Sequence, residues 1–190
     1  MVPLNIPNAL TMLRIVAVPV LVVALLGEIP NGDLWAGIVF GVAAFTDGLD
    51  GYIARRKGDV TTFGKLMDPL ADKLLIVAAL VSLVSLDRLS AWIAMVIIAR
   101  ELAVTGLRAV AVEGGVVIEA SWLGKLKTAL QVAAIMGLIA VDPATVAVDV
   151  LVYAALGATI WSGADYFFGI RRMIESKRQV DRAAVKPARG

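Results

Sequence analysis

The sequence predicts an all-helical (all-α) integral membrane protein with six transmembrane helices and both termini in the cytoplasm, and three observations predict this class. Of its 190 residues, 59% are hydrophobic and 18% are charged, whereas a soluble domain is nearer half apolar and a quarter charged. The apolar residues fall into six runs, each close to the roughly 20 residues that cross a bilayer. The cations gather on alternate connections between these runs.

Polar residues and glycines mark the limits of the first three apolar runs. The first run ends before Gly27, and the second begins after Asp33. Three cations at residues 55–57 end the second run, Asp68 opens the third, and Asp87 follows it. Charged residues at such points are typical of the membrane interface.

The last three runs are bounded in the same way. Glu113 follows the fourth run, Asp142 follows the fifth, and the sixth lies between Asp149 and Arg171. We therefore expect membrane-spanning helices over residues 6–26, 34–54, 68–86, 91–112, 122–141 and 150–170.

Charge alternates from one connection to the next. The connections after the first, third and fifth runs hold five acids and a single cation, Arg88. Fifteen of the eighteen Lys and Arg residues lie on the opposite side, seven of them between Arg171 and Arg189. The positive-inside rule then places both termini in the cytoplasm. We expect one membrane domain, residues 1–172, and a basic cytoplasmic tail, residues 173–190.

The basic tail suits either nucleic acid or anionic lipid. Cations that directly follow a span are drawn to the anionic lipids of the cytoplasmic leaflet. We therefore expect membrane lipids, and no nucleic acid, as the partner of this tail.

The chain contains no cysteine and no histidine. This excludes disulfide frameworks, thiol nucleophiles, the usual zinc sites and imidazole bases. Acid–base or metal chemistry must therefore fall to carboxylates.

Four aspartates lie within 26 residues near the predicted cytoplasmic face. Asp47 and Asp50 are three residues apart and Asp68 and Asp72 are four apart, so each pair projects from one face of its helix. Four carboxylates in an apolar bundle repel one another and are costly to desolvate. Oxygen-rich clusters of this kind suit Mg²⁺ or Mn²⁺, and two ions about 3.5 to 4 Å apart would share four carboxylates.

Simpler interpretations of Asp68 and of three residues near the aspartates stay open. Asp68 before Pro69 is typical of a helix N-cap with proline at the first helical position, although this explains only one acid of the four. Gly51 and Gly64 would let backbone approach a bound ligand, or would let helices pack closely. Arg55 suits a phosphate or an interfacial anchor.

The spacing D-x-x-D-G-x-x-A-R-x8-G-x-x-x-D-x-x-x-D is complete from Asp47 to Asp72 and fixes eight positions. It resembles the signature of the CDP-alcohol phosphotransferase family. The resemblance implies a six-helix homodimeric membrane enzyme that transfers a phosphatidyl group from a CDP-linked lipid to an alcohol and releases CMP. It implies metal ligands at Asp47, Asp50, Asp68 and Asp72, with Asp72 also the general base, and a cytidine diphosphate site lined by Gly51, Ala54, Arg55 and Gly64.

Residues 5–14 and 100–131 are similar to the phosphatidylglycerophosphate synthase branch of that family. This resemblance implies CDP-diacylglycerol as the donor and sn-glycerol 3-phosphate as the acceptor. It adds Asn8, Thr11 and Arg14 to the residues expected to bind the CDP-diacylglycerol donor. For the acceptor phosphate the available cations are Arg100, Arg108, Lys125 and Lys127.

These cations have ordinary alternatives. Arg100 is followed by Glu101, so an internal ion pair competes with a role in the pocket. Lysines near a span end are commonly interfacial anchors. Lys125 and Lys127 are two residues apart and point to different sides of a helix, so we expect at most one of them to reach the substrate.

Three other functions remain as rivals. Cardiolipin synthase and phosphatidylinositol phosphate synthase share the signature and differ in the acceptor. The sequence of residues 68–73 suits phosphatidylinositol phosphate synthase less well than the other enzymes, and residues 100–131 then favour glycerol 3-phosphate. An ion or proton-coupled transporter would spread acids through the bilayer and commonly shows inverted repeats. Here the acids gather near one face.

Overall fold

The structure is a computed structural model of the chain. It describes the backbone of residues 6–57, 62–113 and 122–184, and the side chains of residues 9–46, 70–71, 73–111 and 122–169. Over these ranges the protein is entirely helical, as expected, with six helices and no strand. They are α1 (Ile6–Leu26), α2 (Gly32–Lys57), α3 (Thr62–Ser85), α4 (Ala91–Glu113), α5 (Trp122–Ala140) and α6 (Val146–Ala184).

The helices match the predicted runs, and α2, α3, α4 and α6 extend beyond them, α4 by a single residue. α3 begins at Thr62 rather than at residue 68, and α6 continues to Ala184 rather than ending at residue 170. The end of an apolar run marks where a chain leaves the lipid, not where its helix ends. The polar segment after residue 170 is rich in Arg, Lys, Glu and Gln, which are good helix formers, so the helix continues through it.

The N-cap interpretation of Asp68 is wrong. α3 is already helical from Thr62, so Asp68 and Pro69 lie inside the helix rather than at its start. Proline is tolerated within membrane helices because neighbouring groups satisfy the freed carbonyl. Helix capping therefore does not explain this acid.

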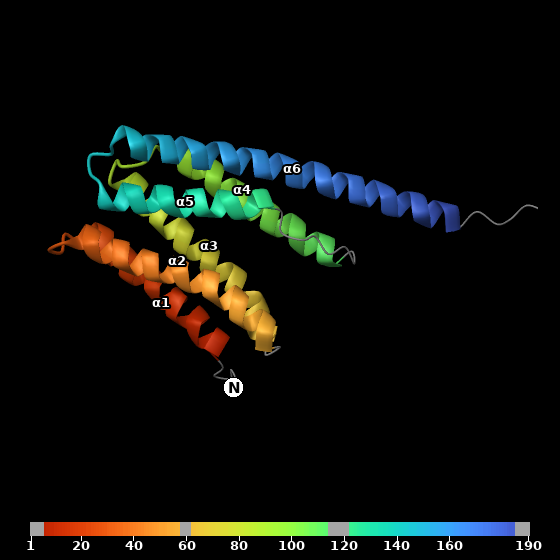
Figure 1. Ribbon diagram of the computed structural model, residues 1–190, viewed down its shortest axis with the longest axis horizontal. Helices are drawn as coiled ribbons and strands as arrows, with labels where there is room; N and C mark the ends of the chain where they lie inside the picture. Colours follow the sequence, from red (N-terminus) through yellow and green to blue (C-terminus); the bar gives the residue numbers. More distant parts are fainter. Residues whose placement is uncertain (1–5, 58–61, 114–121, 185–190) are drawn as a thin grey trace, which may run out of the picture.

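The six helices form two groups of three (Figure 1). α1 packs against both α2 and α3, α6 packs against both α4 and α5, and α2 meets α5 between the groups. The connections α1–α2, α3–α4 and α5–α6 lie at one end of the molecule. Toward the other end, which carries the N-terminus, α1–α3 diverge from α4–α6 in Figure 1.

The interior is apolar near the end that carries the α1–α2, α3–α4 and α5–α6 connections. Phe40, Leu83 and Ile139 are fully buried there. Gly37 and Gly41 of α2 face α5, because an added Cβ would lie 3.8 Å from Ile139 and 3.7 Å from Met136. In this chain the Gly37-x-x-x-Gly41 pattern therefore packs α2 within the bundle.

The outer surface is typical of a membrane protein. Large apolar side chains such as Phe45 and Trp161 are exposed on it, as expected where lipid replaces water. Three helical segments in the described residues are long and apolar enough to cross a membrane: Ala9–Leu26, Trp122–Ala140 and Val146–Gly169. Shorter apolar helical segments occur at Gly32–Thr46 and Lys73–Ser85.

Candidate functional site

The backbone places the four aspartates on two consecutive helices. Asp47 and Asp50 lie in the second half of α2, and Asp68 and Asp72 lie in the first half of α3. Only residues 58–61 separate the two helices. The side chains of these aspartates lie outside the described residues, as do those of Asn8, Gly51, Ala54, Arg55 and Gly64.

A layer of buried polar side chains crosses the helix bundle beside these positions. Arg14 on α1 is 3% exposed, and Glu101 on α4 and Lys127 on α5 are each 4% exposed. Burying a charge is costly unless it is paired. These charges therefore need internal partners. The buried polar side chains among the described residues are Thr11, Arg14, Ser82, Glu101, Lys127, Gln131, Thr159 and Ser162, and four of them, Arg14, Glu101, Lys127 and Gln131, line one cavity.

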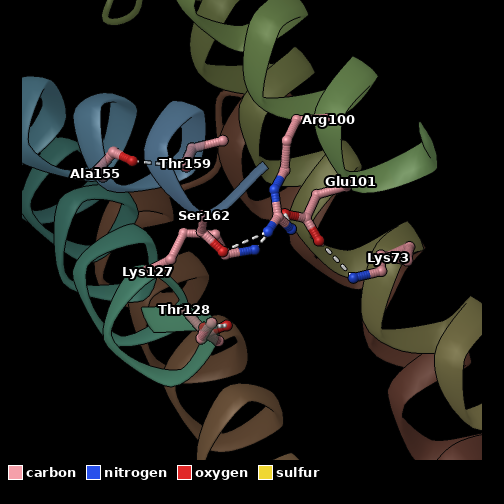
Figure 2. A network of polar contacts seen from close by, with 9 residues as sticks. Lys73, Arg100, Glu101, Lys127, Thr128, Ala155, Thr159 and Ser162 are labelled. Carbon is pink, nitrogen blue, oxygen red and sulfur yellow. Dashed lines mark hydrogen bonds and ion pairs between the residues drawn. The ribbon is translucent and has the colours of Figure 1, made fainter. Parts of the chain in front are cut away.

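The Glu101 carboxylate is the centre of this layer. Lys73 Nζ of α3 donates to Glu101 Oε2 at 2.5 Å, and Lys127 Nζ of α5 donates to Oε1. Arg100 Nη1 donates to the same Oε1 at 3.2 Å. Figure 2 shows the carboxylate between Lys73 on one side and Arg100 and Lys127 on the other. One acid thus joins α3, α4 and α5 through three cations.

Arg100 also joins α4 to α6. Its Nη2 donates to Ser162 Oγ at 2.7 Å. The next residue on α6 is Gly163, where an added Cβ would lie 3.1 Å from Arg100 Cγ. The glycine therefore provides room for the arginine side chain. The internal ion pair expected as an alternative for Arg100 exists, and its role toward an acceptor stays a prediction.

A cavity of about 230 Å³ opens beside Glu101. Ala43 and Ala44 of its wall lie one turn before Asp47, and Lys73 directly follows Asp72. The cavity is therefore next to the parts of α2 and α3 that carry the aspartates. Its lining residues are Arg14, Ala43, Ala44, Lys73, Leu75, Ile76, Glu101, Lys127, Thr128, Gln131 and Val132.

The described lining of this cavity is positively charged. Arg14, Lys73 and Lys127 contribute three cations, and Glu101 contributes one anion. Walls of low dielectric strengthen the field of such a cluster. The arrangement is suited to binding an anion with several acceptor oxygens, such as a phosphate group.

Of the four predicted acceptor cations, only Lys127 lines the described cavity, whereas Arg100, Arg108 and Lys125 do not. Lys125 is exposed, whereas Lys127 on the same helix is buried, as their spacing predicts. Arg108 is also exposed, and its guanidinium carbon lies 5.8 Å from the centre of the Tyr166 ring. The structure brings together Arg100 and Lys127 through Glu101, and it does not bring Arg108 or Lys125 into this network.

The sequence did not single out Glu101, Ser162 or Gly163 as site residues. In the sequence, Glu101 stands out only as a possible ion-pair partner of its neighbour Arg100. Its partners Lys73 and Lys127 are 28 and 26 positions away, so their meeting depends on how the helices pack. An acid within an apolar run is itself a signal for a functional site, and this signal could have identified Glu101.

Comparisons with known proteins agree with the signature. The family described as CDP-alcohol phosphatidyltransferase matches residues 4–161. A CDP-diacylglycerol–glycerol-3-phosphate 3-phosphatidyltransferase of Bacillus subtilis is 41% identical over 180 residues, covering 86% of this chain and 93% of that protein. A probable phosphatidylglycerophosphate synthase of Mycobacterium tuberculosis is 42% identical over 181 residues, covering 92% of this chain and 86% of the relative.

A third relative comes from Haemophilus influenzae. It is a CDP-diacylglycerol–glycerol-3-phosphate 3-phosphatidyltransferase that is 38% identical over 169 residues. The match covers 85% of this chain and 91% of that protein.

Proposed function

The chain belongs to the CDP-alcohol phosphatidyltransferase family, and from this premise we propose that it transfers the phosphatidyl group of CDP-diacylglycerol to sn-glycerol 3-phosphate. The products are phosphatidylglycerophosphate and CMP. The relatives named for this activity match most of their own length and most of this chain. The observation that carries the choice of acceptor is the buried cationic cavity beside the aspartate-bearing helices.

This cavity favours an acceptor with a phosphate monoester, which glycerol 3-phosphate and inositol phosphate carry and phosphatidylglycerol does not. Such an acceptor can use the positive charge of Lys73 and Lys127, which line the cavity. Cardiolipin synthase and phosphatidylinositol phosphate synthase remain rivals within the family because they share the donor and differ in the acceptor. Membership in a family of transferases leaves no support for the transporter.

We propose that Asp47, Asp50, Asp68 and Asp72 hold divalent metal, Mg²⁺ or Mn²⁺ and two ions in number. The set fits these ions because all four residues offer hard carboxylate oxygens, and because the backbone places them on two helices joined by a four-residue connection. When bound, such ions neutralise the pyrophosphate of the donor and stabilise CMP as the leaving group.

The remaining chemistry falls to the residues of the chain. The acceptor hydroxyl oxygen forms a new bond to the phosphorus of the phosphatidyl group, and the bond from that phosphorus to CMP breaks. Asp72 takes the hydroxyl proton during the attack as general base. Asn8, Thr11, Arg14, Gly51, Ala54, Arg55 and Gly64 are the proposed contacts for the CDP-lipid.

The acceptor phosphate is proposed to bind on the cationic side of the cavity. Lys127 is the proposed buried ligand of the phosphate. Arg100 lies near Lys127, because both side chains donate to the same oxygen of Glu101. Arg108 lies on α4 and Lys125 on α5, both exposed. Their positive charge would guide the acceptor anion toward the cavity.

We also propose a topology and a location for the protein. Six spans with both termini in the cytoplasm follow from the distribution of cations, and the metal site then faces the cytoplasm in the cell membrane. Residues 1–172 form the membrane domain, and the basic tail, residues 173–190, binds anionic membrane lipids. The active form is a homodimer.

A single assay tests the reaction. The purified protein is incubated with CDP-diacylglycerol, Mg²⁺ or Mn²⁺ and one acceptor at a time: glycerol 3-phosphate, phosphatidylglycerol or inositol phosphate. We expect CMP release and a lipid product of the mass of phosphatidylglycerophosphate with the first acceptor only. A chelated sample is the control. Absence of CMP release with every acceptor would contradict the proposal, and product with another acceptor alone would change the acceptor.

A further inference from the structure

The Glu101 network has more positive charge than an ion pair needs. Three cations from three helices contact one carboxylate that is 4% exposed. A purely structural buried cluster is stable when its charges balance, because an uncompensated buried charge is strongly destabilising. This cluster is unbalanced among the described side chains, and it lines a cavity large enough for further atoms.

The ammonium groups of Lys73 and Lys127 also have hydrogen-bond donors left for a ligand in the cavity. Each ammonium group has three N–H donors. Among the described residues, Lys73 and Lys127 each donate to Glu101 and to no other side chain. Both also line the cavity. Each therefore retains donors for an anion in the cavity while Glu101 fixes the position of the nitrogen.

We propose that Glu101 is the positioning residue of the acceptor site, and that it holds Lys73 and Lys127 as a pair that binds the phosphate of the acceptor. Glu101 does not contact the reacting atoms. It acts through the two lysines, keeping their ammonium groups from repelling one another before the acceptor arrives. Lys73 thereby becomes an acceptor ligand in addition to the four cations proposed above. This inference rests on the proposed function.

Lys73 lies between the proposed phosphate-binding residues and the proposed general base, Asp72. Its side chain is 29% exposed, whereas that of Lys127 is 5% exposed. It directly follows Asp72 on α3, so the phosphate ligand and the proposed general base belong to the same helical turn. A phosphate bound between Lys73 and Lys127 would hold the acceptor next to the residue that takes its proton.

The test separates acceptor binding from donor binding. Initial rates of CMP release are measured for the wild type and for Glu101→Gln, varying glycerol 3-phosphate at saturating CDP-diacylglycerol and then the reverse. We expect Glu101→Gln to raise the KM for glycerol 3-phosphate about tenfold, the usual effect of losing one charged hydrogen-bond network. The KM for the donor should stay within about twofold.

A conservative variant and a matched control sharpen the result. Glu101→Asp keeps the charge and should recover part of the acceptor KM. Asp33→Asn also neutralises an acid that is paired with an arginine, but near the other end of the bundle, and should leave both KM values unchanged. Equal changes in donor and acceptor KM for Glu101→Gln would overturn the proposal, as would an unchanged acceptor KM.

A second variant covers the case in which Glu101→Gln does not fold. Lys73 is more exposed than Lys127, so Lys73→Gln is the milder change. It should raise the acceptor KM and spare the donor KM, and an unchanged acceptor KM would overturn the proposal. Failure of the wild type to release CMP with glycerol 3-phosphate is a different outcome, because it rejects the proposed function itself.

Discussion

Arg88 and Asp33, 55 positions apart, form a bidentate ion pair, with Nη1 2.8 Å from Oδ1 and Nη2 2.9 Å from Oδ2. Arg88 Nη2 also lies 2.9 Å from Oδ2 of Asp142. Arg88 comes from the α3–α4 connection, Asp33 from the start of α2, and Asp142 from the α5–α6 connection. One arginine therefore joins the three helical hairpins at the end of the bundle opposite the aspartates.

Arg88→Ala is expected to lower the stability of the protein without changing its kinetics. The hydrogen bond to Asp33 raises the pKa of Arg88 above its ordinary value. A raised pKa gives stability that is complete below the ordinary arginine pKa and is lost only above it, so the loss should not depend on pH near neutrality. The side chains of both acids are about half exposed, so we expect a loss of about 1 kcal/mol.

Thermal unfolding in detergent measures this loss. Arg88→Lys keeps the charge but not the two-pronged geometry, and it should lie between the alanine variant and the wild type. An unfolding midpoint of Arg88→Ala equal to that of the wild type would show that these contacts do not stabilise the protein.

The sequence predicted the fold more completely than the contacts between helices. Apolar runs of span length determine that helices form, and charged residues determine where each span ends. All six helices could therefore be located, and α1 was predicted with both limits correct. The continuation of α6 to Ala184 was not, because hydropathy reports contact with lipid and not helix formation.

Asp72→Asn should abolish turnover while CDP-diacylglycerol still binds. The amide of asparagine has no basic oxygen that can take the proton of the acceptor hydroxyl, and it keeps the size of the side chain. We expect the rate of CMP release to fall at least about a hundredfold. Binding of radiolabelled donor to the purified variant is the companion measurement. Normal turnover would show that another group is the base.

Asp68→Ala should change the dependence on metal. Removing one of four proposed carboxylate ligands weakens the binding of a divalent ion. We expect the concentration of Mg²⁺ needed for half-maximal rate to rise about tenfold or more, by analogy with the loss of one charged contact. The matched control is Asp149→Ala, an acid in the first turn of α6. An unchanged Mg²⁺ requirement for Asp68→Ala would remove Asp68 from the metal site.

The candidate site was predicted in part. The spacing of the aspartates predicts a metal site, because acids at three- and four-residue intervals share a helix face, and the roles of these acids stay a prediction. The network around Glu101 was not predicted, because it depends on the depths at which Lys73, Glu101 and Lys127 meet on three different helices. Sequence spacing reports neighbours on one helix and not neighbours across the bundle.

Lys127→Gln should impair the acceptor more than Lys125→Gln does. The two lysines are on one helix, but Lys127 is buried on the cavity wall and Lys125 is exposed. We expect Lys127→Gln to raise the KM for glycerol 3-phosphate about tenfold and Lys125→Gln to raise it about twofold or less. Both values come from initial rates at saturating donor. A larger effect at Lys125 would place the acceptor phosphate outside the cavity.

Gly163→Ala should disturb the acceptor site through Arg100. An added Cβ would lie 3.1 Å from Arg100 Cγ, so the arginine must shift by a few tenths of an ångström. Its guanidinium holds Ser162 and Glu101, and we expect the KM for glycerol 3-phosphate to rise about threefold, the effect of a partly weakened charged contact.

Gly157→Ala is the matched control for this prediction. It lies on the same helix, and no atom stands within 4 Å of its added Cβ among the described residues. Both substitutions remove a glycine from a helix interior, which favours the helix by about 1 kcal/mol. Gly157→Ala should therefore raise the unfolding temperature and leave the acceptor KM unchanged. If both variants change the acceptor KM equally, the effect comes from the stiffness of α6 and not from Arg100.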